Sequence, residues 1–538
     1  MGQTQSTLMK SGYKIEKESE SHAVVTKDGE KFCIRKLQIS TNAELISQLE
    51  TLKTTSHPHV MSIANSFQDE DQHIYYVVTE YCQGGSLAEK IKLKRGPEQE
   101  FEVLSWIAEI CMALRFLHEK ELLHKNLTPQ NIFFTEFETL CLSGFGETQA
   151  NDTNVSTAGD EAINYLAPEV FTQATYETKS DIWSVGCILY ELCTQQLAFS
   201  SDTTVSLIPK IICGPYPSLE GQWSPEFCEL LSDIWTSDPD SRPTASEILR
   251  HPIILRCLYK KSKTTVEHLQ TQLGKLTSVA DSLERVHQGA TIGSLTGGVI
   301  GAMGGITSIV GLVLAPFTLG ASLVVTGVGV GVGVAGGLTA GASNITNMVN
   351  QSSDRKTVGS IIKEFDAKIS AVALWLQEIS ISLQTIGTCY EGDTPDDEES
   401  PRNQATGTGN WVRFGTRVGR GLGAITELFR LVRVANIGKI AAQASRAVRV
   451  AEVATGVLSG LFVAADIFFI AMDAKEIHNI RQTQEDGTTN SEIMKFVQSI
   501  RHAATELQEV LDEFKAVISD VPFLENEREL EWDHMEGM

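Results

Sequence analysis

The feature that most constrains this chain is a run of 68 residues, 286–353, that contains no Asp, Glu, Lys or Arg. Within it, residues 292–314 and 318–341 are each long enough for a helix to cross the hydrocarbon core of a bilayer. Pro316 stands between these two segments, and proline breaks helical hydrogen bonding. The run therefore predicts an apolar helical hairpin within residues 290–345.

Glycine spacing supports the hairpin. In each arm four glycines recur at every fourth residue, which places them on one helical face where two backbones can pack closely. They are Gly293, Gly297, Gly301 and Gly305 in the first arm and Gly329, Gly333, Gly337 and Gly341 in the second. Two alternatives stay open: a buried hairpin in a soluble bundle, and an extended strand over GVGVGVGV, whose period is two.

A second apolar run, residues 453–471, carries Asp466 and precedes Asp473. A carboxylate is costly in lipid unless it is neutralised or faces a water-filled path. We therefore expect insertion or conduction that depends on pH, with Asp466 and Asp473 as its sensors. The alternative is that both residues cap a helix of a soluble bundle.

Other segments fit a helical, membrane-facing region. Arg413, Arg417 and Arg420 share one helical face beside Trp411 and Phe414, as in an interfacial helix that meets anionic headgroups; a solvated helix face is the alternative. Residues 264–286, 357–385 and 490–521 show helical apolar spacing, which predicts bundle helices.

Composition and the N-terminal residues indicate where in the cell the protein is expected. The 538 residues exceed one hydrophobic core, and the net charge of −24 argues against a nucleic-acid partner. The ten cysteines form no CxxC pair, which favours a reducing compartment. The N-terminus lacks the apolar core of a signal peptide, while Gly2 and Ser6 fit the N-myristoylation pattern. We expect a cytoplasmic, membrane-associated protein rather than a secreted one.

Residues 13–254 carry four motifs in one order: EYCQGGSL from Glu80, APE from Ala167, DIWSVGCILYEL from Asp181 and SDPDSRPTASEIL from Ser237. In this the region resembles a protein kinase domain, and most of all the NIMA-related serine/threonine kinases. The resemblance implies a two-lobed α+β fold. It also implies that Glu169 pairs with Arg242 and that Asp181 braces the catalytic loop.

The catalytic positions of that family are changed here. Phosphoryl transfer needs a catalytic-loop aspartate, a metal-binding aspartate and a phosphate-binding lysine. Their places are taken by Asn126 in HKNLTPQN, Gly144 in GFG and Arg35 in FCIR. Thr128 replaces the catalytic-loop lysine, and ESESHAVV stands where a glycine-rich loop is expected.

These changes predict a catalytically inactive kinase domain with no cofactor. If ATP still bound, the resemblance implies contacts with Thr79, Glu80, Cys82 and Asn131. The glutamate that pairs with the strand lysine falls near Gln48, with Glu44 and Glu50 as alternatives. The competing hypothesis is an active serine/threonine kinase that uses Lys31 or Lys36 in place of the lost lysine.

The second half resembles the apolipoprotein L family. The resemblance rests on GSLTGGVIGAMGGITSIVGLVLAPFTLGASLVV and on the later LSGLFVAADI, and it covers roughly residues 262–515. It implies an all-α region that binds lipid, inserts into membranes and, in some members, conducts ions. A soluble or secreted lipid carrier is the alternative.

The expected organisation is therefore a short tail (1–12), a kinase-like domain (13–254), an apolipoprotein L-like region (262–390), an acidic linker (391–409), a second helical region (410–520) and an acidic tail (521–538). We expect the kinase-like domain to regulate or recruit the membrane region through a protein partner. The membrane itself, with anionic headgroups, is the second expected partner.

Overall fold

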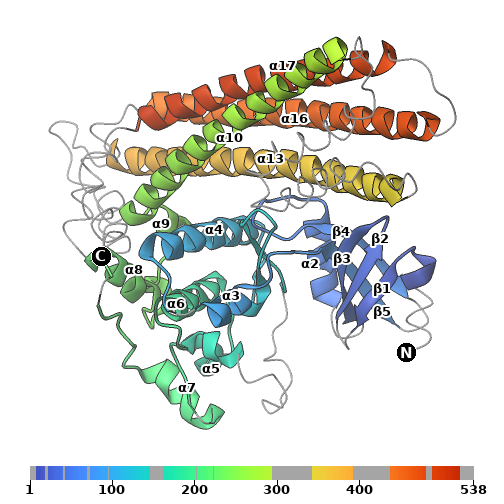
Figure 1. The fold of residues 1–538 in the computed structure, drawn as a ribbon. Helices are drawn as coiled ribbons and strands as arrows, with labels where there is room; N and C mark the ends of the chain where they lie inside the picture. Colours follow the sequence, from blue (N-terminus) through green and yellow to red (C-terminus); the bar gives the residue numbers. More distant parts are fainter. Residues whose placement is uncertain are drawn as a thin grey trace. The chain divides into compact units, whose positions relative to one another are not determined.

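The computed structural model describes residues 8–18, 22–39, 43–69, 73–94, 96–145, 162–201, 203–221, 223–293, 342–391, 437–479 and 487–521 (Figure 1). The chain divides into two compact units. The N-terminal unit comprises Met1–Leu258 and Thr385–Val434, and the C-terminal unit comprises Tyr259–Gln384 and Ala435–Met538.

The N-terminal unit begins with a five-stranded antiparallel sheet in the order β1-β2-β3-β5-β4. Asp28 and Gly29 join β2 to β3, both with positive φ, which is the two-residue turn that suits the twist of a hairpin. Helix α2 (Ala43–Lys53) contacts β4. The strands are β1 (Lys14–Glu18), β2 (His22–Lys27), β3 (Glu30–Gln38), β4 (Ile63–Asp69) and β5 (Ile74–Glu80).

Period-two alternation is clear in β2, where Ala23 and Val25 are buried and Val24 between them is half-buried. In β3, Ile34 and Leu37 are both buried although their spacing of three puts them on opposite faces, and Arg35 and Lys36 are half-buried. A core cluster forms on one side of the sheet and includes the first described residue, Leu8. Its buried members are Leu8, Tyr13, Ala23, Val25, Ile34, Tyr76 and Val78.

The second lobe is helical and is built around α4 (Glu100–Glu119) and α6 (Thr178–Thr194), both largely buried. Trp183 of α6 is fully buried and contacts the rings of Phe199, Tyr216 and Trp235. The remaining elements are α3 (Leu87–Leu93), η1 (Pro129–Asn131), β6 (Ile132–Phe134), β7 (Leu140–Leu142), η3 (Ala162–Tyr165), α5 (Pro168–Thr172), α7 (Thr204–Cys213), α8 (Pro225–Ile234), η4 (Pro239–Ser241) and α9 (Ala245–Leu249).

Both predicted scaffold contacts are confirmed. Arg242 donates to both carboxylate oxygens of Glu169, at 2.9 and 3.2 Å. Asp181 accepts hydrogen bonds from the backbone amides of His124 and Lys125, each at 3.0 Å. These contacts hold the catalytic-loop segment in place.

The C-terminal unit is a bundle of long helices (Figure 1). Salt bridges join α10 to α17 (Asp281–Arg501, 2.9 Å) and α16 to α17 (Arg446–Glu513, 2.7 Å). Thr455 of α16 donates to Asp366 of α13 at 2.7 Å. The helices are α10 (Pro252–Gly293), α13 (Ala342–Glu391), α16 (Ile437–Asn479) and α17 (Gly487–Ser519).

The predicted bundle helices 264–286, 357–385 and 490–521 are confirmed as parts of α10, α13 and α17. Helix α10 continues through residues 254–262, so no linker separates the two expected regions there. Asp466 and Asp473 lie well inside α16, which makes the capping alternative wrong.

Several predictions fall on residues outside the described ranges. These are the hairpin positions Gly297, Gly301, Gly305, Pro316, Gly333 and Gly337, the lipidation position Gly2, the linker after Glu391 and the basic stretch from Trp411 to Arg420.

Candidate functional site

The degenerate phosphate-binding position is engaged within the protein. Strand β3 directs Arg35 toward the GFG segment, where its Nη1 donates to the carbonyl oxygen of Phe145 at 3.4 Å. A guanidinium engaged in this way contacts backbone at the place where the family's lysine holds phosphates.

The two candidate replacement lysines are paired with β1 carboxylates. Lys36 lies 2.6 Å from Glu18 and Lys31 lies 3.0 Å from Glu16. Lys36 is next to Arg35 on the strand, so its side chain leaves the opposite face of the sheet. Neither contact brings a lysine to the GFG segment.

Glu50 is one of the alternatives for the α2 glutamate that pairs with the strand lysine in the kinase family, and it has other partners here. Glu50 of α2 accepts from Ser66 at 2.7 Å and from the hydroxyl of Tyr75, so it ties α2 to β4 and β5. Gln48 is half-buried in the same helix. The predicted register near Gln48 therefore places an amide, not a carboxylate, on this part of α2.

Asn131 is the metal-binding residue that the sequence retains, and its amide has protein partners. Its Nδ2 donates to the carbonyl oxygen of Asn126 at 2.9 Å and lies 3.4 Å from the Thr128 hydroxyl. Gly144, with φ of +76°, packs against it so closely that a Cβ at 144 would lie 2.7 Å from Asn131 Cγ. A carboxylate at 144 would require Asn131 to move.

The place of the catalytic base holds an amide, which does not accept a proton near neutral pH. The backbone amide of Asn126 points to His124 Nδ1 at 3.4 Å. Burial lowers the pKa of His124 to about 4, so this imidazole is neutral. Among the described residues no cluster of His, Cys, Asp or Glu has metal-binding geometry.

Three of the four expected nucleotide-contacting residues, Thr79, Glu80 and Cys82, lie at the end of β5 or just after it, whereas Asn131 lies in η1. The Thr79 hydroxyl donates to the Cys33 carbonyl at 3.4 Å, and Glu80 accepts from Ser62 at 2.8 Å. Burial raises the pKa of the Cys82 thiol to about 11, and Glu80 adds to this effect. The thiol is therefore protonated and unreactive at physiological pH.

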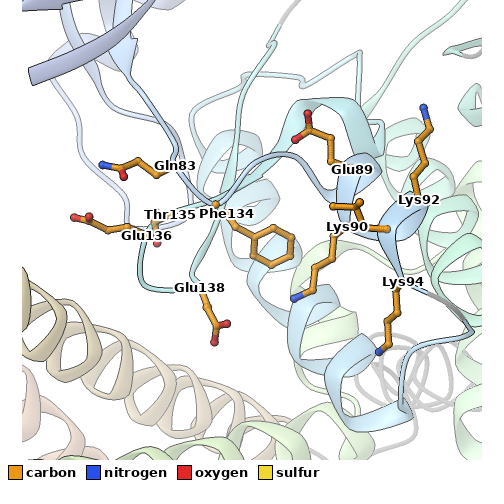
Figure 2. A pocket seen from close by; sticks show the side chains of 11 residues that line it. Gln83, Glu89, Lys90, Lys92, Lys94, Phe134, Thr135, Glu136 and Glu138 are labelled. Atoms are coloured by element: carbon orange, nitrogen blue, oxygen red, sulfur yellow. The ribbon is translucent and has the colours of Figure 1, made fainter. Parts of the chain in front are cut away.

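A separate hollow of about 1070 Å³ lies beside this segment, and Figure 2 shows its lining. Gly84 and Phe134 form its floor, where the Gly84 amide donates to the Phe134 carbonyl at 3.1 Å. Lys90 lies 4.5 Å from the Phe134 ring centroid. None of Thr79, Glu80, Cys82 and Asn131 lines the hollow, so it is distinct from the nucleotide positions.

The C-terminal unit contains two helical segments long and apolar enough to cross a membrane. Ile361–Ile386 of α13 is 67% buried in the bundle, as is typical of a core helix, whereas Ala442–Phe468 of α16 is only 28% buried. Asp466 is half-buried on α16, and the side chain of Asp473 is outside the described residues. The sequence had pointed to α16 but not to α13.

The fold and these contacts define the class: a two-lobed kinase domain joined to an all-α bundle. The protein kinase domain family matches residues 13–254, and the apolipoprotein L family matches residues 260–516. The chain therefore combines a protein kinase domain with an apolipoprotein L domain.

The curated relatives match the kinase domain. Mouse serine/threonine-protein kinase Nek1 is 33% identical over 243 residues, which cover 44% of this chain and 20% of Nek1. Mouse Nek4 is 32% identical over 246 residues, or 42% of this chain and 30% of Nek4. Human Nek11 is 28% identical over 262 residues, or 47% and 39%. The chain thus spans only a fifth to two fifths of these relatives.

Among solved structures, Rad53 in complex with AMP-PNP is 23% identical, with a TM-score of 0.39. The match covers 47% of this chain and 70% of that chain.

Proposed function

We propose that this chain is a lipid-binding, membrane-inserting protein whose kinase domain is catalytically inactive and regulates or targets the apolipoprotein L domain. The observation that carries the catalytic inactivity is the contact between Arg35 and Phe145, together with the packing of Gly144 on Asn131. These residues fill the phosphate and metal positions with contacts inside the protein.

The membrane part is supported by α16 and by the charge-free run that precedes α13. Only 28% of the apolar window of helix α16 is buried. Residues 286–353 add a long sequence without charge, which has a low cost in lipid and a high cost in water. Both features suit a region that exchanges water for a bilayer, with anionic headgroups as the polar partner.

An active serine/threonine kinase is the second candidate function. It is favoured by 33% identity to Nek1, whose name is that of a serine/threonine kinase. In that case a lysine other than Arg35 must hold the phosphates and another group must accept the hydroxyl proton. Lys31 and Lys36 are the lysines of β3, the strand that carries Arg35. Both would have to leave their carboxylate partners.

The two candidates differ in one assay. We expect purified full-length protein with Mg²⁺ and labelled ATP to transfer no phosphate to a generic basic substrate above the level of an Asn126→Ala variant. The reason is that losing the base alone costs roughly two to four orders of magnitude. A Lys31→Met/Lys36→Met variant is the control, because an unorthodox kinase would lose its activity there. Transfer by the wild type that both variants abolish would establish the active kinase.

A further inference from the structure

Helix α16 carries apolar side chains on the side away from the bundle as well as on its packed side. An apolar window within Ala442–Phe468 has a mean hydropathy of 1.6. Ala454, Leu458, Leu461 and Ala465 are buried and face the bundle. An apolar helix face is normally covered. The outward side of α16 has no such cover among the described residues.

That outward side is a continuous stripe, which we call the outer stripe. Its members follow one another at separations of three or four residues, so they share the face opposite the buried one. Val453, Val463, Ile467 and Ile470 are 53–59% exposed, and a Cβ at Gly456 or Gly460 would meet nothing within 4 Å. The outer stripe consists of Val453, Gly456, Gly460, Val463, Ile467 and Ile470.

The stripe has a defined length and one charged end. From Val453 to Ile470 it spans about 26 Å of helix. It contains no charged residue, and the exposed Arg449 and Glu452 mark where it stops. A contiguous exposed apolar surface of this kind marks an interaction site.

The position of the neighbouring helix ends indicates what covers it. Helices α13 and α16 are antiparallel, since Asp366 bonds to Thr455 while Gly359 packs against Phe462. Ala342 lies 17 residues before Gly359, and Asn479 lies 17 residues after Phe462. The start of α13 and the end of α16 are therefore at the same end of the bundle.

The end of α10 lies there as well. Arg501 of α17 bonds to Asp281 and Glu284, only nine residues before α10 ends at Gly293. Figure 1 shows the last turn of α10 and the first turn of α13 at the bundle end where α16 passes to α17. Gly293 and Ala342, which flank the charge-free residues 294–341, are therefore both at the end of the bundle toward which the outer stripe runs.

We propose that the outer stripe is the docking surface for residues 294–341 of the same chain. The predicted hairpin arms, of 23 and 24 residues within 292–341, would each be about 35 Å long as helices. The path along α16 from Asn479 back to Val453 is about 39 Å, and the stripe takes up about 26 Å of it. An arm is therefore long enough to reach most of the stripe from that end, and its glycines at every fourth residue suit close packing on Gly456 and Gly460.

A tethered segment outcompetes other occupants. Attachment through Gly293 and Ala342 gives residues 294–341 an effective concentration of roughly millimolar at the stripe. A second copy of the chain would have to reach that concentration in solution. The docked arrangement removes two apolar surfaces from water at once.

This inference rests on the proposed function and adds its resting state. Without lipid, residues 294–341 lie on α16. A bilayer then competes for the same apolar surface, and insertion exposes the outer stripe.

The test is amide hydrogen exchange of full-length protein without lipid. We expect protection across residues 294–341 at low micromolar concentration, and about tenfold faster exchange there in Val463→Asp/Ile467→Asp. The control is Ser445→Asp, which places a carboxylate on an exposed position of α16 beyond the stripe. The control should leave exchange of 294–341 unchanged.

A second variant guards against misfolding of the first. Gly456→Leu/Gly460→Leu raises helix propensity at two open positions, so α16 keeps its fold while close packing on the stripe is lost. It should also expose 294–341. Unprotected 294–341 in the wild type, or protection unchanged in both stripe variants, would overturn the proposal. Protection that disappears on dilution would assign the stripe to a second copy instead.

The exchange experiment contains no lipid. A negative result there would therefore contradict docking on the outer stripe without bearing on membrane binding. A protein that shows docking but never binds vesicles would retain this inference in part and lose the membrane role.

Discussion

Replacing Arg242 with methionine lowers the free energy of unfolding of the kinase domain by about 3 to 5 kcal/mol. Arg242 is fully buried and Glu169 is 3% exposed. Arg242 also donates to the backbone carbonyls of Lys179 at 2.6 Å and Thr236 at 3.2 Å. Methionine preserves volume but leaves the Glu169 carboxylate buried with only Ser180 as a donor from this network.

Urea unfolding followed by tryptophan fluorescence measures the effect, because Trp183 and Trp235 lie in the same lobe. The matched control is Lys31→Met. Its partner Glu16 is 3.0 Å away, but both side chains are solvated, at 52% and 38% exposure. Such a solvated pair contributes little to stability. Equal effects of the two substitutions would show that burial of the Glu169–Arg242 pair has no energetic consequence.

Replacing Asp181 with alanine destabilises the same domain by about 3 kcal/mol or more, because several buried donors lose their acceptor together. Besides the amides of His124 and Lys125, the carboxylate accepts from Tyr176 at 2.7 Å and from His118 at 2.9 Å. The catalytic-loop segment should loosen, which amide exchange of residues 122–131 reports. A loss below about 1 kcal/mol would mean that water replaces the carboxylate without cost.

The effect of Asp181 depends on pH in a defined direction. Burial alone would raise the pKa of its carboxyl, but the hydrogen bond from His118 and the charge of His118 lower it below the ordinary value of 3.8. A carboxyl whose pKa is lowered by folding stabilises the protein above its unfolded pKa. The stability difference between wild type and Asp181→Asn should therefore persist at neutral pH and decline below about pH 4. A difference that grows as the pH falls would contradict this assignment.

The lobes of the kinase domain could be predicted from sequence because their signals are local or fixed in spacing. The Asp28–Gly29 turn specifies a hairpin by itself, and the buried alternation of β2 follows from period two. The partners Glu169 and Arg242 are 73 residues apart, yet they sit in motifs whose resemblance to the protein kinase family implied the pair.

The contacts of the degenerate site could not be predicted in the same way. Arg35 was identified as a replaced lysine, but its contact with Phe145 joins residues 110 positions apart and has no sequence signature. The same holds for the packing of Gly144 on Asn131. The sequence shows that arginine stands in place of the lysine, but it does not show which residue this arginine contacts.

Two features of the helical half show a different limit. The continuous helix through residues 254–262 was readable, since no proline or glycine interrupts the chain between Ile253 and Lys263. The division of α16 into a buried and an exposed face was not readable. An apolar helix gives no preferred direction, so only the positions of α13 and α17 determine which side is covered.

The most direct test of the central claim is dye release from anionic vesicles by the full-length protein, measured from neutral pH down to about pH 5, where carboxyls with raised pKa values titrate. The account predicts release that depends on pH, and greater release at neutral pH by Asp466→Asn, because this substitution removes a carboxylate that is costly in lipid. Vesicles that bind the protein but retain their dye at every pH would contradict membrane insertion and leave a lipid-bound carrier.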